Sequence, residues 1–102
     1  MPNVEELRKF VEMSPTDPFP RYGLALQLRS DGKLEDAIAE LRTLVEKFPT
    51  YVPGHQQLGL SLQQAGRTDE AKAAYRAGIV AAEKTGNRHA ADEMTGALEM
   101  LG

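Results

Sequence analysis

The sequence contains a repeated stretch, Leu58-Gly59-Leu60-Ser61-Leu62, which is followed by Ala71-Lys72-Ala73-Ala74-Tyr75. Residues of the same kinds stand 34 positions earlier in the chain. The matched pairs are Leu24 and Leu58, Ala25 and Gly59, Leu28 and Leu62, Gly32 and Gly66, Ala37 and Ala71, and Leu41 and Tyr75. A fixed period of this length is typical of stacked structural units, so the sequence predicts a repeat protein.

Composition favours one globular domain and excludes several kinds of chemistry. The 102 residues, of which 41% are hydrophobic and 26% charged, are enough for a modest core. The net charge of -3, with both signs interspersed, gives no electrostatic reason to expect nucleic acid or an anionic membrane as partner. The absence of cysteine excludes disulfides, thiolate catalysis and cysteine-bound zinc.

The N-terminal residues do not form a secretory signal, because they contain neither a basic segment nor an apolar one. No later run of apolar residues is long enough to span a bilayer. The sequence therefore predicts a cytoplasmic protein that does not act at a membrane.

Hydrophobic periodicity and helix-breaking residues predict six helices joined by short connections, with no strands. The expected ranges are 3–13, 18–30, 34–48, 52–65, 69–84 and 88–101. Asp17 can cap the second helix, and Pro18 suits its first position. Pro49 ends the third helix, and Thr68 is a suitable N-cap for the fifth. The predicted fold class is therefore all-α.

The first predicted helix looks like half of a repeat. Its apolar stripe consists of Val4, Leu7, Phe10 and Val11. Three of these residues have apolar counterparts 34 positions later, in the second helix of the first copy. The helix over 3–13 therefore corresponds to the second half of a repeat whose first half is missing.

The register of the last predicted helix can be read in two ways. Continuing the 34-residue step turns Asp92 and Glu93 inward, where two unpaired carboxylates cost several kcal/mol. A shift of two residues buries Ala91, Met94 and Leu98 instead. The shifted register is therefore preferred, and the polar residues then form the solvent-facing side of a terminal cap.

The repeated residues resemble the tetratricopeptide repeat, a helix pair whose consensus also has a period of 34 residues. In the second copy the matching residues are His55, Leu58, Gly59, Leu62, Ala71 and Tyr75. In the first copy they are Arg21, Leu24, Ala25, Leu28, Ala37, Leu41 and Pro49. The resemblance implies an α-solenoid of antiparallel helix pairs that forms a single domain over residues 1–102. Its parts are an N-terminal half-repeat helix (3–13), repeat 1 (18–51), repeat 2 (52–85) and a C-terminal capping helix (88–101).

Small residues in each copy are expected to bring the paired helices close together. The facing pairs are Ala25 with Ala37 and Gly59 with Ala71. The residues expected to fill the space between layers are Leu24, Leu28, Leu41, Leu58, Leu62 and Tyr75. Gly78 stands where the first copy has Leu44, although glycine costs roughly 1 kcal/mol against alanine in a helix. We therefore expect the last helix to approach the backbone closely at Gly78.

No arrangement of residues in the sequence is typical of an enzyme. The two histidines, His55 and His89, lie in no metal-binding or nucleophile motif. Arg21 and His55 stand where the family often has tryptophan, so thinner packing is expected there and His55 is expected to pack rather than react. A weak metal site at His89 with Asp92 and Glu93 is the alternative to a solvated helix face, which is preferred. The prediction is therefore no catalytic residue, no metal and no cofactor.

The resemblance implies a concave groove, lined by the first helix of each pair, that holds an extended peptide or a partner helix. The residues matching this face are Phe19, Tyr22, Leu26, Arg29 and Ser30 in repeat 1, and Pro53, Gln56, Leu60, Gln63 and Gln64 in repeat 2. The apolar strip among them consists of Phe19, Tyr22, Leu26 and Leu60, rimmed by polar groups as interaction surfaces often are. The alternative is that the N-terminal helix or packing within the repeat covers part of this strip.

These observations predict a non-catalytic protein–protein interaction module that binds a peptide or helix segment of a partner protein. One variant of the family binds C-terminal carboxylates through lysine, asparagine and arginine, but Tyr22, Leu26 and Gln57 stand at three of those positions. That mode of binding is therefore not expected. The alternative function is self-association as a homodimer through the terminal helices, where Val4 and Phe10 are available.

Overall fold

The computed structural model describes residues 2–102 as six α-helices. They are α1 (Val4–Met13), α2 (Pro18–Ser30), α3 (Leu34–Lys47), α4 (Val52–Gln64), α5 (Thr68–Lys84) and α6 (Arg88–Leu101). No strand occurs in this part of the chain. The all-α fold class is therefore confirmed, and each helix begins and ends within one residue of its expected range.

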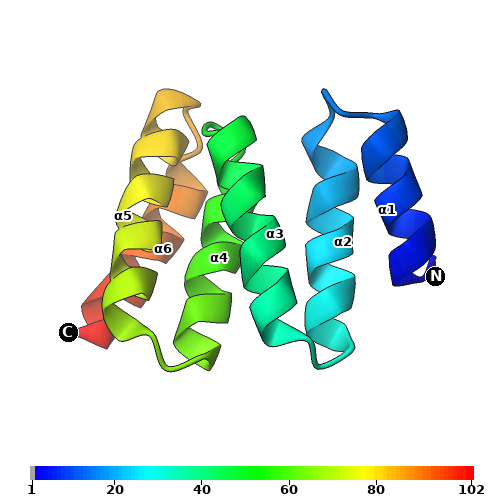
Figure 1. The fold of residues 1–102 in the computed structure, drawn as a ribbon. Helices are drawn as coiled ribbons and strands as arrows, with labels where there is room; N and C mark the ends of the chain where they lie inside the picture. Colours follow the sequence, from blue (N-terminus) through cyan, green and yellow to red (C-terminus); the bar gives the residue numbers. More distant parts are fainter. Residues whose placement is uncertain (1) are drawn as a thin grey trace.

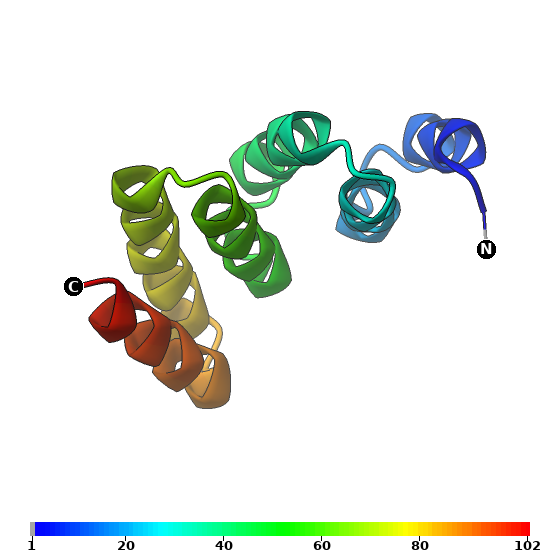
Figure 2. The same ribbon diagram turned by 90° about the horizontal axis from the view of Figure 1, so that it is seen from below.

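The helices form an arc in which each helix packs against the next one in the chain (Figure 1). Figure 2 shows α1, α3 and α5 on the outer side of this arc and α2, α4 and α6 on the inner side. The molecule measures 38 × 29 × 21 Å. This arrangement is the predicted α-solenoid, in which each helix pair contacts its neighbours in sequence.

The two predicted N-caps differ in the structure. The side chain of Asp17 accepts a hydrogen bond from the backbone N–H of Phe19 at 3.0 Å, so Asp17 caps α2 as expected. Thr68, however, is the first residue of α5 and not its cap, so that prediction was wrong. Arg67 stands at the N-cap position, and its side chain makes no capping hydrogen bond.

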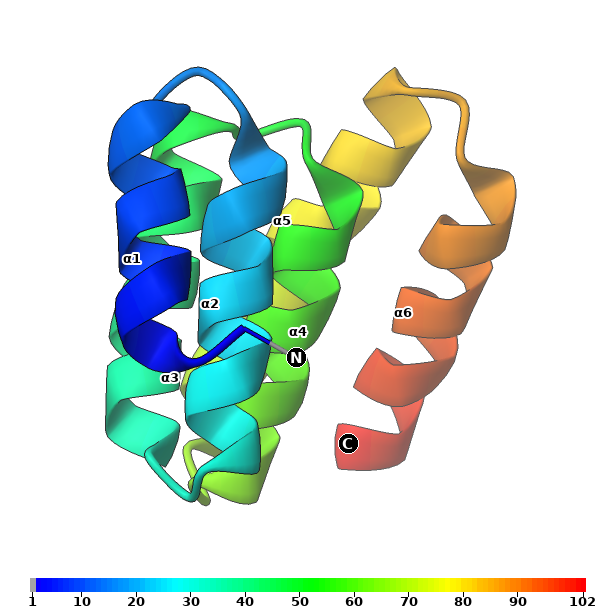
Figure 3. The ribbon, with the colours of Figure 1, turned by 90° about the vertical axis from the view of Figure 1, so that its right-hand side faces the viewer.

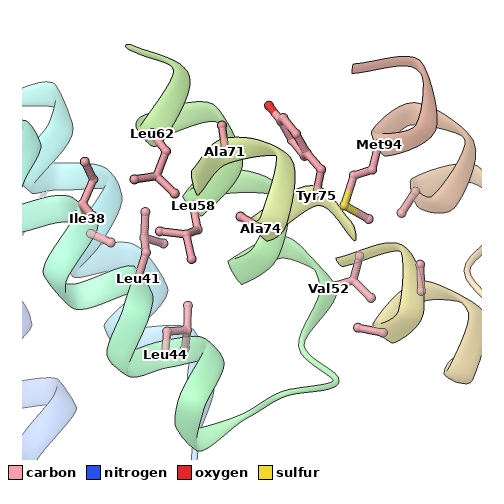
Figure 4. Close-up of a cluster of buried hydrophobic side chains, with 14 residues drawn as sticks. Ile38, Leu41, Leu44, Val52, Leu58, Leu62, Ala71, Ala74, Tyr75 and Met94 are labelled. Atoms are coloured by element: carbon pink, nitrogen blue, oxygen red, sulfur yellow. The ribbon is translucent and has the colours of Figure 1, made fainter. Parts of the chain in front are cut away.

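Two groups of buried side chains hold the helices together. The larger group lies between α3, α4, α5 and α6 and includes Leu41, Leu44, Leu58, Leu62, Tyr75 and Met94 (Figure 4). The smaller group consists of Leu24, Leu28 and Ala37, covered by Val4, Leu7 and Val11 of α1. The leucines and Tyr75 that were expected between the layers are all buried. Phe10 was expected on the apolar stripe of α1 but is 46% exposed, because the other three residues of the stripe make the contact with the core.

Two interfaces, between α3 and α4 and between α5 and α6, each combine a large residue with a glycine. The glycine is on the later helix in the first interface and on the earlier helix in the second. Leu44 of α3 packs toward Gly54 of α4, where an added Cβ would lie 3.1 Å from the leucine side chain. In the next interface the glycine is on the earlier helix, since Gly78 of α5 leaves the space that Met94 of α6 fills. A Cβ at Gly78 would also lie 2.8 Å from the Cβ of His55. The predicted close approach of α6 at Gly78 is therefore confirmed.

Gly59 leaves room for the ring of Tyr75. An added Cβ at Gly59 would lie 2.5 Å from the Cε1 atom of that ring. Ala71, which was expected to face Gly59, is fully buried, but the nearest atoms belong to Tyr75. In the first copy the corresponding residues are Ala25 and Leu41, so the larger ring in the second copy is accommodated by the smaller residue opposite it.

The register of α6 departs from the 34-residue step, as the cost of burying two carboxylates predicted. Asp92 and Glu93 are exposed and Met94 is buried. The buried alanine is Ala90, however, and not Ala91 as expected. Residues of α6 that are only partly buried are Ala91, Ala97, Leu98 and Leu101. The prediction was therefore right about Met94 and only partly right about Ala91 and Leu98, which are partly buried.

An ion pair occupies part of the space where the family often has tryptophan. The Nη1 atom of Arg21 lies 2.6 Å from the Oε1 atom of Glu40, which joins α2 to α3. Arg8 of α1 contacts the other oxygen of the same carboxylate at 3.4 Å. A cavity of about 180 Å³ remains beside these side chains, in agreement with the thinner packing that was expected.

Replacing Gly78 with alanine is expected to lower the free energy of unfolding by about 1–3 kcal/mol, because the new methyl group would overlap Met94 and His55. The higher helix propensity of alanine, worth roughly 1 kcal/mol, opposes this loss. Gly96→Ala in α6 is the matched control, since an added Cβ there meets nothing within 4 Å. It is expected to stabilise the protein by about 0.5–1 kcal/mol. Urea unfolding measures both changes, and equal stability of the two variants would contradict the close approach of α6.

Candidate binding groove

The predicted groove residues belong to α2 and α4, which together with α6 make the inner side of the arc (Figure 3). Phe19 is 67% exposed and Leu60 is 40% exposed. The partly buried residues are Tyr22, Leu26, Arg29, Pro53 and Gln56, and the other exposed ones are Ser30, Gln63 and Gln64. None of these residues is fully buried, so the whole predicted surface is accessible.

Three aromatic side chains form a row at the start of α2. The ring centroids of Phe19 and Tyr22 are 6.4 Å apart, and those of Tyr22 and Tyr51 are 5.7 Å apart in an edge-on arrangement. Tyr51 directly precedes α4 and was not among the predicted residues. Sequence reasoning missed it because the periodic pattern of the helix does not extend to this turn. The contact with Tyr51 limits the freedom of the Tyr22 ring.

An apolar cavity of about 320 Å³ opens where α1 meets α2. Its lining residues are Pro2, Leu7, Phe19, Gly23, Leu26, Gln27 and Ser30. α1 thus forms one wall of this cavity through Leu7 and leaves Phe19 mostly uncovered. The N-terminal helix therefore borders the apolar strip. Tyr22 and Leu26 are partly buried, and Tyr22 packs against the core, so part of the strip is covered, as the alternative prediction had it.

Arg29 has a structural contact that its place in the predicted groove did not suggest. Its Nη1 atom donates a hydrogen bond to the hydroxyl oxygen of Ser61 at 3.1 Å. Ser61 is fully buried, so the bond joins α2 to α4 across the two repeats. The guanidinium group is consequently held at the boundary between the repeats and is not freely mobile above the surface.

A second cavity, of about 330 Å³, lies between α4 and α6. Its lining residues are Gln56, Gln57, Leu60, Tyr75, Glu93, Met94 and Ala97. The hydroxyl group of Tyr75 donates a hydrogen bond to Oε1 of Gln63, which holds this groove residue against α5. Glu93 and Ala97 were absent from the predicted groove, because the register of α6 depends on its contact with α5. The structure thus adds α6 to the candidate site.

The two histidines lie in different surroundings. His55 is buried, and its Nε2 atom lies 2.8 Å from the carbonyl oxygen of Pro49, in agreement with the expected packing role. His89 is exposed on α6, and its Nε2 atom lies 3.4 Å from Oε1 of Glu93. Within residues 2–102, no group of three or more histidine, cysteine or acidic side chains is arranged to hold a metal ion.

Arginine–glutamate pairs join the helices on the outer side of the arc. Arg67 and Glu35 approach within 2.8 Å, and Arg42 and Glu70 within 2.7 Å. Both pairs link α3 to the start of α5, so they bridge the two repeats. The four side chains are between 40% and 64% exposed, and such pairs each contribute at most about 1 kcal/mol.

Across residues 2–102, every helix is too short or too polar to cross a lipid bilayer.

The helix pairs match a known repeat family. The sequence profile of the tetratricopeptide repeat matches residues 21–51 and 56–77, which make up half of the chain. The chain therefore belongs to the tetratricopeptide repeat family. This fold generally mediates protein–protein interaction, and members of the family are generally non-catalytic repeat modules that bind protein partners.

Several solved structures share the fold. A tetratricopeptide repeat domain protein from Salinibacter ruber, determined by NMR, has a TM-score of 0.81 and 33% identity over 85% of this chain and 88% of that one. A crystal structure from the same organism has a TM-score of 0.78 and 33% identity over 83% and 96% of the two chains. Protein BPP2914 from Bordetella parapertussis, 24% identical, has a TM-score of 0.80 over 99% of this chain and 88% of that one. No curated protein sequence matches the chain.

The stability of the fold is expected to fall as the pH rises above about 10. Burial raises the pKa of Tyr51, with smaller contributions from nearby Tyr22 and Asp17, and burial also raises the pKa of Tyr75. As the pH rises, the tyrosines therefore lose their phenolic protons in the unfolded chain before they lose them in the folded protein. The stability that is fully present below the pKa of the unfolded chain is lost as the pH rises through the higher pKa of the folded protein. Urea unfolding at several alkaline pH values is expected to show a shallower decline for Tyr51→Phe than for the unsubstituted protein. Identical declines would contradict the raised pKa of Tyr51.

Proposed function

We propose that this protein binds a peptide or helix segment of a partner protein along α2, α4 and α6, without catalysing a reaction. The exposed apolar strip supports this proposal most directly. Phe19 and Leu60 are large apolar side chains on helices that are otherwise packed, and both are exposed. A partner that covers them removes apolar surface from water, which stabilises a complex by up to about 1.5–3 kcal/mol for each side chain fully buried.

The proposed groove is short, and this limits the expected affinity. Within residues 2–102, the inner side of the arc consists of α2, α4 and α6 (Figure 2). A segment lying across three helices buries less than the roughly 1,600 Å² of a standard protein–protein interface. We therefore expect micromolar binding, with most of the energy coming from the few apolar anchors.

Contacts within the groove support binding, because they order its side chains in advance. Less side-chain conformational entropy is then lost when a partner is bound. Arg29 is tied to Ser61, and Tyr22 packs against Tyr51, so these side chains are already ordered without a partner. The anchors stand on helices rather than on loops, which keeps their spacing fixed. A terminal carboxylate is not the proposed ligand, because Tyr22 stands where the carboxylate-binding variant has a lysine and supplies no positive charge there.

A peptide selected from a random library by the unsubstituted protein tests the groove. Phe19→Glu combined with Leu60→Glu is expected to weaken its binding at least about tenfold, because each anchor becomes a carboxylate that must lose its water. Fluorescence polarisation measures the affinity, and circular dichroism checks that the helices remain. Val80→Glu on α5 is the control, since Val80 is also a half-exposed apolar residue but lies on a helix that carries none of the predicted groove residues. Equal binding by the double variant and the control would place the binding surface elsewhere.

A second candidate function is self-association through α1. Phe10 is half-exposed and Met13 is 76% exposed, so this terminal helix presents two large apolar side chains to solvent. Val4, which was also expected to be available, packs on the smaller core group instead. Within residues 2–102, α1 packs chiefly against α2, and a second copy of the chain can cover its other side.

Phe10→Glu separates this candidate from the groove. If the chain dimerises through α1, light scattering over a wide range of concentrations is expected to show a dimer that this substitution converts to a monomer, because a charge replaces the buried contact. A monomer at every concentration would dispose of the second candidate. Binding of the selected peptide is expected to be unchanged by Phe10→Glu, since Phe10 lies on α1 and outside the predicted groove residues.

A further inference from the structure

The cavity between α4 and α6 has a lining that differs from the rest of the candidate groove. Gln56, Gln57 and Leu60 of α4 face it, together with Glu93 and Ala97 of α6. The apolar cavity near α1 is lined mainly by apolar groups, whereas this one carries two amides and a carboxylate. No lysine or arginine lines it. Besides the donor groups of the two amides, its polar lining offers hydrogen-bond acceptors and one negative charge, and no positive charge.

Gln57 contributes an acceptor that lacks a partner. Its side-chain oxygen is buried and accepts no hydrogen bond from residues 2–102. Most buried polar groups in proteins are hydrogen-bonded, and an unsatisfied one lowers stability. The last torsion of a glutamine side chain is broad, so the amide can turn toward the cavity at little cost. A donor that entered the cavity would satisfy this oxygen.

Glu93 brings a negative charge to the same cavity. Its Oε1 atom lies 3.5 Å from Nε2 of Gln56 and 3.4 Å from Nε2 of His89, and both distances are long for a charged acceptor. The shortest arginine–glutamate pairs in the part of the chain that the structure describes are Arg21 with Glu40, Arg42 with Glu70, and Arg67 with Glu35. Glu93 forms no such pair with a lysine or an arginine within residues 2–102. Its carboxylate therefore remains available to a closer cation.

We propose that this cavity binds a basic side chain, lysine or arginine, of the partner segment; this inference rests on the proposed function. Ammonium and guanidinium groups only donate hydrogen bonds, which complements the acceptors of Gln57 and Glu93. Leu60, Met94 and Ala97 supply apolar surface for the aliphatic stem of such a side chain. Charge complementarity then sets which residue type is accepted at this end of the groove and in which direction the segment lies.

Selected peptides give the first test. Peptides bound by the unsubstituted protein are expected to share a lysine or arginine at one position, and norleucine at that position is expected to weaken binding roughly fivefold. Glu93→Gln is expected to cause a similar loss and to remove the preference. Asp92→Asn is the matched control, because Asp92 is the adjacent exposed carboxylate and does not line this cavity. Equal effects of the two substitutions would overturn the proposal, since a general charge effect would then explain the result.

A small probe tests the cavity independently of any selected peptide. Nα-acetyl-lysine methylamide at millimolar concentration is expected to shift the NMR signals of the Gln57 side-chain amide and of Ala97, whereas the norleucine analogue is not. Shifts that are equal for both probes, or absent for both, would overturn the proposal. Gln57→Leu is expected to abolish the lysine-specific shift and to raise the Tm by a few degrees, because an unsatisfied buried acceptor is replaced by an apolar group. A lower Tm would mean that the oxygen is satisfied in the free protein.

The outcomes separate this inference from the proposed function. Peptides that need Phe19 and Leu60 but show no preference for a basic residue would overturn the basic subsite and leave the groove in place. A lysine-specific shift at Gln57, without any peptide that depends on Phe19 and Leu60, would support the subsite and overturn the apolar groove.

Discussion

The inner side of the arc depends on the close approach of helices at positions that lack a Cβ atom. Gly59 makes room for the ring of Tyr75, which holds α4 against α5. Gly78 makes room for Met94, which holds α6 against the same helix. Because protein interiors are closely packed, a single methyl group at either position would have to displace a neighbour. The distance between α4 and α6, and the cavity that lies between them, follow from these two contacts.

The exchange of large and small residues explains why α6 departs from the repeat. Between the two repeats, Leu44 of α3 lies beside Gly54 of α4, and the residues 34 positions later are Gly78 and Arg88. In the structure Arg88 is exposed, and Met94 is the residue of α6 that fills the space at Gly78. The carboxylate next to Met94 then reaches the cavity beside α4. The polar end of the proposed groove is therefore a consequence of how the last helix packs.

The two ends of the inner side offer different chemistry to a partner. At the α2 end, Phe19 and Tyr22 present aromatic surface next to an apolar cavity. At the α6 end, Gln57 and Glu93 present acceptors that the described part of the chain leaves unsatisfied or weakly paired. Arginines on the outer side pair with other glutamates, so they do not neutralise this end. A segment with an apolar residue at one end and a basic residue at the other complements both features.

Local signals in the chain were enough to predict the repeat, the six helices and most of the core. Asp17 and Pro18 start α2 through their own side-chain and backbone preferences. Periodic leucines mark the buried faces, because each helix packs an apolar stripe against its neighbours. Packing in three dimensions set the rotation of α6, the bond from Arg29 to Ser61 and the unsatisfied oxygen of Gln57. Each of these depends on side chains that meet from different helices. Residue type and spacing alone do not specify these contacts between helices, because the contacts depend on the volumes of all the side chains around them.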